Sequence, residues 1–314
     1  MLLEQSLLSQ LDEGLDAVEE QLRQVILTDV DILEDASKHI VESGGKRLRP
    51  NVTLLSYLAA GGQDIAEAVP LAAAIELVHT ATLVHDDIND HSLTRRGKIS
   101  VHARWGRTFA LLTGDYLFTK VYELMAPYGA DFNVIMANAC VKLVEGETLQ
   151  AEAAKNGAIN QEIYKTIVSR KTASLFEAAS RMGALIAGAD EMIVKALADY
   201  GYNLGLAFQI VDDVLDIIGD PQTLGKPIGS DVVQGTGAIM AHNGKKARNL
   251  EVAPEVDPIK EMLAKLRDSG AVDIALAQAR EWANRSRKSL SLVPYSLARE
   301  ELDNLVKLVI ERER

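Results

Sequence analysis

The chain has 314 residues, a formal net charge of −12, 47% hydrophobic residues and only 5% aromatic residues. This acidic balance argues against a nucleic-acid partner, because no basic face compensates for it. The single cysteine, Cys140, excludes an internal disulfide and favours a reducing, cytoplasmic location. The segment "MLLEQSLLSQLDEGLD" lacks the basic region of a signal peptide, and we expect no membrane span.

Apolar residues recur at helical spacing along most of the chain. Helices are predicted over 3–26 and 30–41, then up to "AAGGQD", from about 70 into the first aspartates, and over 107–126, 132–154, 161–188, 191–218, 258–268, 271–292 and 296–313. Pro50 is expected to stop a helix after the glycine turn "ESGGKRLRP", and 91–106 to form a polar loop. No repeat or linker divides the sequence, so we expect one all-α domain over 1–314.

Two groups of aspartates with the same spacing each end an apolar helical stretch. They are Asp86, Asp87 and Asp90 in "LVHDDIND", and Asp212, Asp213 and Asp216 in "FQIVDDVLDIIGD". Carboxylates at i and i+4 repel each other by about 0.2–0.5 kcal/mol, and negative charge is unfavourable at a helix C-terminus. Oxygen ligands suit Mg²⁺, whose shell is often completed by substrate phosphates. A solvated helix end explains one such group, but the repetition favours metal binding.

Basic side chains gather in turns near these aspartates. They occur in "GGKRLRP", "RRG", "RKTA" and "LGKP", as Lys46, Arg47, Arg49, Arg95, Arg96, Arg170, Lys171 and Lys226. None of these turns is a Walker phosphate loop. Carboxylates, Mg²⁺ and guanidinium or ammonium groups together indicate a site for a diphosphate. His79 alone would more often be structural than catalytic.

These motifs together resemble the trans-isoprenyl diphosphate synthases of the polyprenyl synthetase family. The resemblance extends through "ARWG", "GDYLF", "VEGE", "RKTASLFEAA", "NLGLAFQIVDDVLDIIGD" and "TLGKPIGSD", and so covers nearly the whole chain. It implies an all-α isoprenoid-synthase fold with helices around a deep central cavity, usually in a homodimer. It also implies head-to-tail condensation of isopentenyl diphosphate with an allylic diphosphate, and leaves room for peripheral membrane contact during product release.

The resemblance further implies roles for individual residues. Three Mg²⁺ ions would be bound with the substrate by Asp86, Asp87, Asp90 and Asp212, with support from Asp213 and Asp216. The allylic diphosphate would contact Arg95, Lys171 and Lys226. Isopentenyl diphosphate would be held by Lys46, Arg49, His79 and Arg96. Thr172 and Gln209 would lie near the developing carbocation.

One position departs from the family pattern. After Asp231 the family usually has glycine followed by lysine, whereas this chain has Thr236 at the lysine position. A cation near the diphosphate is therefore missing, although Lys226 and both aspartate groups are present. We expect the chain to be active.

The helix that leads into the first aspartates allows a prediction of product length. Thr82 and Ala81 lie four and five residues before Asp86, so both should face the cavity below the first metal group. Short-chain members of the resembling family often carry an aromatic residue there. Because both residues are small, we predict a product longer than C20.

Four alternatives stay open at this point. A terpene cyclase or head-to-head synthase would share the fold, but cyclases usually carry a different second metal motif. A farnesyl- or geranylgeranyl-length synthase would share the reaction. A weakly active or inactive subunit of a heteromeric synthase would share the sequence pattern. A helical metal-binding scaffold would leave the basic turns unexplained.

Overall fold

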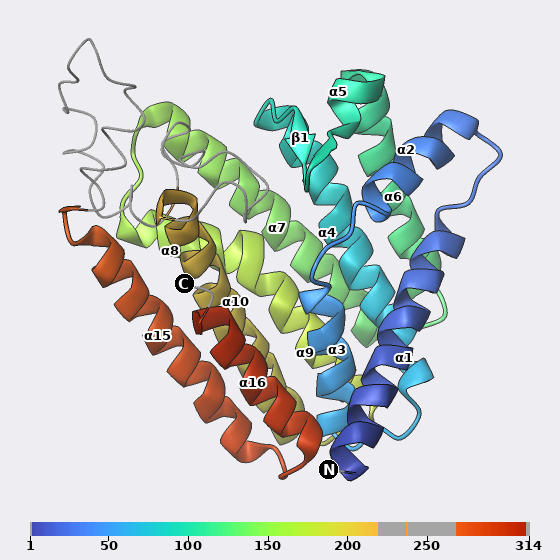
Figure 1. The fold of residues 1–314 in the computed structure, drawn as a ribbon, viewed down its shortest axis with the longest axis vertical. Coiled ribbons are helices and arrows are strands. Elements are labelled where there is room, and N and C mark those ends of the chain that lie inside the picture. Colours follow the sequence, from blue (N-terminus) through green and yellow to red (C-terminus); the bar gives the residue numbers. More distant parts are fainter. Residues whose placement is uncertain (1, 219–236, 238–267, 312–314) are drawn as a thin grey trace. The chain divides into compact units, whose positions relative to one another are not determined.

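The computed structural model describes residues 2–218, 237 and 268–311 (Figure 1). Helices account for nearly all of these residues, which confirms the all-α prediction. In chain order they are α1 Leu2–Val25, α2 Asp31–Val41, α3 Leu48–Ala59, α4 Val69–Asn89, α5 Val101–Trp105, α6 Arg107–Met125, α7 Ala130–Asn156, α8 Gln161–Val168, α9 Ser174–Ile186, α10 Glu191–Ile218, α15 Ala271–Ser289 and α16 Leu297–Glu311. Short 3₁₀ helices occur at η1 Ile65–Glu67 and η3 Leu290–Leu292, and a π-helix at η2 Ser169–Ala173. The predicted helix over 258–268 lies outside the described residues except for its last position.

Two sequence-based predictions are wrong in the N-terminal half. The polar loop over 91–106 contains a hairpin, β1 Thr94–Arg95 and β2 Lys98–Ile99, followed by α5. Its two turn residues, Arg96 and Gly97, have φ of 50° and 75°, as a type I′ turn requires. Pro50 does not end a helix; it lies in the first turn of α3, where its missing N–H has no intrahelical partner to lose.

A third difference concerns the predicted helix over 161–188. The structure divides it into α8, the π-helical η2 and α9. A π-helical turn contains one extra residue, which shifts the helical spacing of apolar residues too little to be noticed in the sequence. Such turns are frequent at functional sites. Lys171 and Thr172 both lie in η2.

Contacts between Cα atoms divide the chain into two compact units. Unit 1 comprises Met1–Asn138, Ala178–Ala198 and Leu292–Leu302, and unit 2 comprises Ala139–Glu177, Asp199–Ser291 and Asp303–Arg314. The expectation of one domain over 1–314 stays a prediction.

Helix α4 forms the centre of unit 1. It packs against α1, α3 and α6, and most of its side chains are buried. The stretch Ile65–Asn89 is long and apolar enough to cross a membrane by length and composition, but 78% of its most apolar window is buried inside the structure. That burial is typical of a core helix. The consequence for the site is that the end of α4, with the first aspartates, rests on a packed core.

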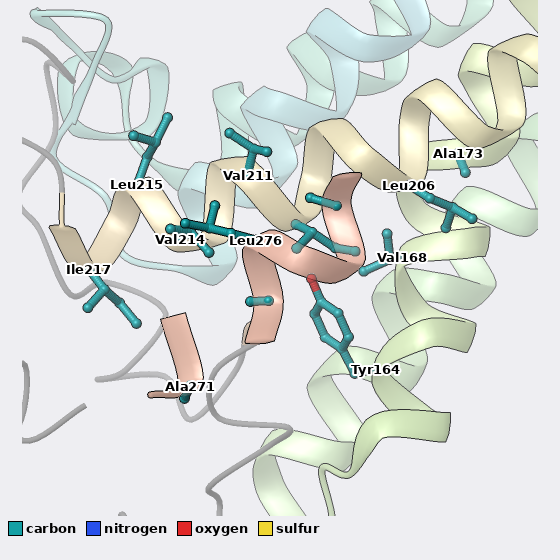
Figure 2. Close-up of a cluster of buried hydrophobic side chains, with 13 residues drawn as sticks. Tyr164, Val168, Ala173, Leu206, Val211, Val214, Leu215, Ile217, Ala271 and Leu276 are labelled. Carbon is teal, nitrogen blue, oxygen red and sulfur yellow. The ribbon is translucent and has the colours of Figure 1, made fainter. Parts of the chain in front are cut away.

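In unit 2, an apolar cluster supports the C-terminal half of α10 (Figure 2). Its members come from α8, η2, α10 and α15, and include Tyr164, Val168, Leu206, Val211 and Leu276. The second aspartate group belongs to the same half of α10. A packed core therefore supports each of the two aspartate groups within its own unit.

Candidate active site

The first aspartate group lies at the C-terminal end of α4, as predicted. Asp86 is half-buried, Asp87 is 1% exposed, and Asp90 is an exposed C-cap residue. The Asp90 N–H donates to the Asp86 carbonyl at 2.8 Å, which closes the last turn. The three carboxylates thus differ sharply in exposure despite their regular spacing.

Arg95 holds the buried carboxylate of Asp87. Its Nε and Nη2 atoms donate to Asp87 Oδ1 at 2.8 and 2.5 Å. Within the described residues, the buried Oδ2 of Asp87 has no hydrogen-bond partner. Burial raises the pKa of Asp87, and the Arg95 guanidinium opposes that rise. The hairpin therefore places one cation directly against the carboxylate group that the sequence assigns to metal.

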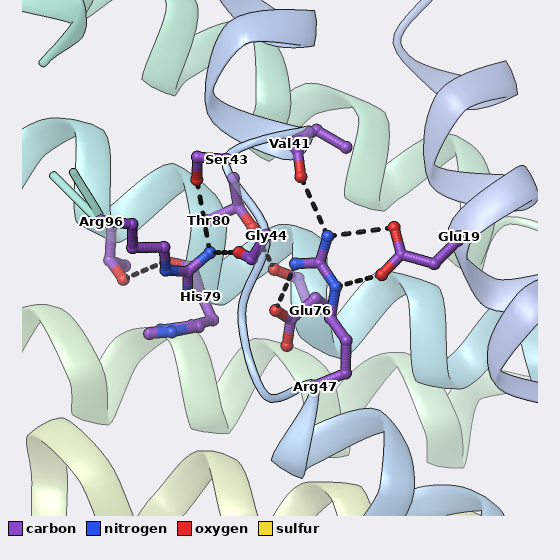
Figure 3. Close-up of polar contacts among 10 residues, drawn as sticks. Glu19, Val41, Ser43, Gly44, Arg47, Glu76, His79, Thr80 and Arg96 are labelled. Atoms are coloured by element: carbon purple, nitrogen blue, oxygen red, sulfur yellow. Dashed lines mark hydrogen bonds and ion pairs between the residues drawn. The ribbon is translucent and has the colours of Figure 1, made fainter. Parts of the chain in front are cut away.

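The glycine turn and Arg96 come together in unit 1 (Figure 3). The Arg96 guanidinium donates to the carbonyl of Gly44 and, at 3.5 Å, to Ser43 Oγ. Gly45 has φ of +147°, and a Cβ there would lie 2.8–2.9 Å from the Arg96 guanidinium atoms. Only glycine combines that backbone conformation with room for the guanidinium. The turn is thus shaped around Arg96.

His79 is half-buried on α4, within a positive environment. Its pKa is well below the usual value because burial disfavours the imidazolium and because Arg49, Arg96 and Arg95 repel it. His79 is therefore neutral near pH 7 and can donate a hydrogen bond without adding charge. His79 is therefore within electrostatic range of Arg49 and Arg96. These are three of the four residues predicted to hold isopentenyl diphosphate. The fourth, Lys46, is exposed in the adjoining turn.

Arg47 has a structural role that sequence analysis missed. It is buried, donates to Val41 O at 2.9 Å and to Glu76 at 2.9 Å, and forms an ion pair with Glu19 (Figure 3). Glu76, a carboxylate inside the otherwise apolar α4, was the available signal that a buried cation would be needed. The turn is consequently fixed to both α1 and α4.

The second aspartate group occupies the last turns of α10. Asp212 is half-buried, whereas Asp213 and Asp216 are buried. Asp213 accepts hydrogen bonds from Tyr164 Oη at 2.5 Å and from Gln209 Nε2 at 2.8 Å. Asp213 is thus engaged by neighbours within unit 2.

Thr172 and Gln209 are in direct contact. Thr172 Oγ1 donates to Gln209 Oε1 at 2.7 Å, across 37 residues of sequence. Lys171 lies beside Thr172 in η2 and forms an ion pair with Glu147 of α7. Its Nζ also donates a hydrogen bond to Gln150 Oε1 at 3.4 Å. A Cβ on Gly146 would lie 2.6 Å from the Lys171 backbone nitrogen, so glycine permits this close approach of α7 and η2.

The two residues predicted to control product length lie on α4, just before the first aspartate group. Thr82 is half-buried and donates to the His79 carbonyl at 2.7 Å, whereas Ala81 is fully buried. Only Thr82 of this pair presents surface. Lys226 and Thr236 lie outside the described residues.

Neither aspartate group is a complete metal cage by itself. Among residues 2–218, 237 and 268–311, no three acidic, histidine or cysteine side chains gather closely enough to hold an ion. Mg²⁺ is usually bound through only one or two carboxylates, with water and substrate phosphates completing its shell. The half-buried Asp86 and Asp212 and the unbonded Oδ2 of Asp87 fit that mode of binding.

A pocket of about 320 Å³ also occurs in unit 2, between α8, α10 and α15. Its lining includes Trp282, flanked by Lys165 and Arg285. None of the residues predicted for the active site lines it. The deep central cavity implied by the family resemblance stays a prediction.

Comparisons with known proteins agree with these motifs. The polyprenyl synthetase family model matches residues 30–266. A short chain isoprenyl diphosphate synthase of Methanothermobacter thermautotrophicus is 37% identical over 292 residues, 88% of this chain and 90% of the relative. Component 2 of the Bacillus subtilis heptaprenyl diphosphate synthase is 33% identical, over 96% of this chain and 89% of the relative.

Solved structures extend the likeness to the fold. The polyprenyl synthase of Caulobacter crescentus CB15, in complex with calcium and isoprenyl diphosphate, has a TM-score of 0.90 and 34% identity, with 98% of each chain covered. The chain is therefore a prenyltransferase with the all-α isoprenoid-synthase fold. It belongs to the polyprenyl synthetase family, and its activity is that of a trans-polyprenyl diphosphate synthase.

Proposed function

We propose that the enzyme condenses isopentenyl diphosphate head-to-tail with an allylic diphosphate in a Mg²⁺-dependent reaction. The observation that supports this most strongly is the pair of aspartate groups, each with one buried carboxylate fixed by its neighbours and one half-buried carboxylate before it. Asp86, Asp87, Asp90 and Asp212 are the carboxylates proposed to bind the metals, three Mg²⁺ ions in the loaded enzyme. Asp213 and Asp216 are proposed to support them from buried positions.

The basic residues of unit 1 are proposed to bind isopentenyl diphosphate. Arg49, Arg96 and Lys46 supply charge, and the neutral His79 supplies a hydrogen bond. Burial and the nearby arginines lower the pKa of His79, and a bound diphosphate should offset the part that is due to the arginines. Arg95, Lys171 and Lys226 are proposed to contact the allylic diphosphate.

Catalysis requires stabilisation of the departing diphosphate. The allylic C–O bond breaks, which leaves a carbocation that the double bond of isopentenyl diphosphate attacks, and a proton then leaves to the released diphosphate. Bound Mg²⁺ supplies positive charge for the leaving group. Lys171, fixed by Glu147, offers a second positive charge that needs no reorganisation during the reaction. Thr172 and Gln209 offer oxygen atoms to the carbocation.

Product length is proposed to exceed C20, because Thr82 is small and presents surface on α4. The heptaprenyl relative supports a long product, and the short-chain relative supports the alternative of a farnesyl- or geranylgeranyl-length product.

The assembly is proposed to be a homodimer in the cytoplasm. Exposed apolar side chains on α6, including Leu112 and Tyr122, offer a surface that a second copy would cover. The Bacillus subtilis relative is named as component 2 of its synthase, which supports the alternative of a subunit in a heteromer. Light scattering of the purified chain separates a dimer from a monomer that awaits a different partner.

The decisive experiment is mass analysis of products from purified protein. The protein is incubated with isopentenyl diphosphate, an allylic primer and Mg²⁺, and a parallel reaction contains excess chelator. Polyprenyl diphosphates longer than C20 are expected only with the metal. Absence of condensation with every allylic primer from C5 to C20 would overturn the proposed activity for the isolated chain.

A further inference from the structure

Tyr164 of α8 has no role in the reaction described above, yet it contacts the second aspartate group. Its ring belongs to the apolar cluster of unit 2 (Figure 2), and its hydroxyl donates to Asp213 Oδ2 at 2.5 Å. Both residues are buried, and Asp213 is only 6% exposed. A buried carboxylate requires such partners, because its desolvation would otherwise be costly. The orientation of Asp213 therefore depends on Tyr164.

The hydrogen bonds continue from Asp213 to the predicted reaction centre. The Gln209 amide directs its NH₂ group towards Asp213, whose Oδ1 accepts the hydrogen bond from Nε2 at 2.8 Å. The Gln209 carbonyl oxygen is then left to accept from Thr172 Oγ1, at 2.7 Å. The Thr172 hydroxyl proton consequently points to Gln209, and the lone pairs of Oγ1 point elsewhere.

We propose that Tyr164 is a positioning residue that acts through Asp213 and Gln209. It fixes the Gln209 amide so that Thr172 presents oxygen lone pairs, and no hydroxyl proton, to the allylic carbocation. A cation is stabilised by lone pairs and destabilised by an O–H dipole of the opposite orientation. This inference rests on the proposed function, because it takes from there the place of Thr172 beside the carbocation.

Unit 2 offers a matched control. Tyr202 of α10 is bonded through its hydroxyl to Ser169 Oγ at 2.9 Å, at the start of the same η2 segment. Tyr202→Phe removes a hydroxyl from the same unit without touching Asp213. Tyr164→Phe and Tyr202→Phe should both lower the melting temperature modestly. Only Tyr164→Phe should lower kcat, by about 10- to 100-fold, while KM for isopentenyl diphosphate stays within about twofold of wild type.

A double-mutant cycle tests the linkage itself. Thr172→Val removes the end of the hydrogen-bonded series, so adding Tyr164→Phe to it should lower kcat by less than about twofold more. A second cycle uses the metal-free protein. In it, the changes in melting temperature caused by Tyr164→Phe and Asp213→Asn should be non-additive.

Four results would overturn the inference: wild-type kcat in Tyr164→Phe, an equal loss of kcat in Tyr202→Phe, additive effects on kcat in the first cycle, or additive shifts in the second. A wild-type chain without condensation activity would instead overturn the proposed function. The metal-free cycle would still decide whether Tyr164 and Asp213 are linked.

Discussion

The two aspartate groups share one sequence pattern, but different chemistry fixes the buried carboxylate of each. In unit 1, Asp87 is held by the guanidinium of Arg95, which the hairpin supplies. In unit 2, the donors to Asp213 among the described residues include two neutral groups, the Tyr164 hydroxyl and the Gln209 amide. A charged partner adds positive potential, whereas neutral donors fix geometry and leave the local charge unchanged.

This difference matches the surroundings of each group. Unit 1 gathers Arg49, Arg95 and Arg96, and burial together with the field of these arginines lowers the pKa of His79 and keeps it neutral. The neighbourhood of Asp213 leads through Gln209 to Thr172, an uncharged pair. The comparison suggests that the first region serves mainly to bind charged groups, and that the second also serves to orient groups beside a reacting carbon. The following predictions would break or sharpen that comparison.

The largest effect is expected from the half-buried aspartates. Asp86→Asn and Asp212→Asn should each lower turnover by about 10²–10³-fold, because each removes a charge that holds the metal near the leaving group. Helix content should be unchanged, since substitution relieves like-charge repulsion. Steady-state kinetics and circular dichroism measure both, with Asp131→Asn as an exposed control. Full activity of either variant in excess chelator would contradict the metal assignment.

The next effect concerns the division of substrates between basic residues. Lys46→Ala and Arg49→Ala should weaken isopentenyl diphosphate binding by about 1.5–3 kcal/mol, the size of one charge-assisted hydrogen bond. Lys226→Ala should instead weaken binding of the allylic diphosphate. Calorimetric titration of each ligand alone measures the two affinities. Equal losses for both ligands in all three variants would mean that these basic residues do not divide the substrates.

A third prediction exploits the residue four positions before each aspartate group. Phe208 precedes Asp212 in this way and packs on Phe176, with ring centroids 5.5 Å apart. Thr82 has the same position relative to Asp86. Thr82→Phe should give α4 an aromatic barrier and shift products towards C15–C20, with kcat largely retained.

Product mass analysis tests this barrier, with Thr82→Val as the matched control that should leave product length unchanged. Ala81→Phe should also shorten the product, but Ala81 is fully buried, so overpacking should cost about 1–3 kcal/mol of stability as well. A wild-type enzyme that stops at C15, or a Thr82→Phe variant with unchanged products, would refute the predicted role of this position.

The smallest effect is the pH dependence of stability caused by His79. Its pKa in the folded chain lies below the ordinary value of 6.5, so the unfolded chain binds the proton first as pH falls. The stability contributed by neutral His79 is present above pH 6.5 and is lost as pH falls towards the folded-state pKa. Between pH 6.5 and the folded-state pKa, His79→Gln should reduce the slope of unfolding free energy against pH by at most about 1.4 kcal/mol per pH unit.

Denaturant titrations at several pH values measure this slope, with the exposed His91→Gln as control. An unchanged slope in His79→Gln would show that the arginines and burial do not depress its pKa.

Sequence patterns predicted the features that depend on many residues. The apolar length of α4 and the repeated aspartates carry enough signal to place both groups at helix ends, and the arginines after Asp90 indicated a nearby cation. The hairpin was missed because strands of two residues show no alternation. The link from Tyr164 to Asp213 spans 49 residues and involves one hydroxyl, so no local pattern encodes it. Thr172 and Gln209 were paired only through family resemblance.

The fit between Gly45 and Arg96 has a consequence for related sequences. A side chain at position 45 would occupy the space of the guanidinium and adopt an unfavourable backbone conformation. Relatives that keep arginine at position 96 should therefore also keep glycine at position 45, although the two positions are far apart in sequence. Loss of the arginine would remove the clash but leave the φ of +147°, so glycine should persist at position 45 even in chains that lack the arginine.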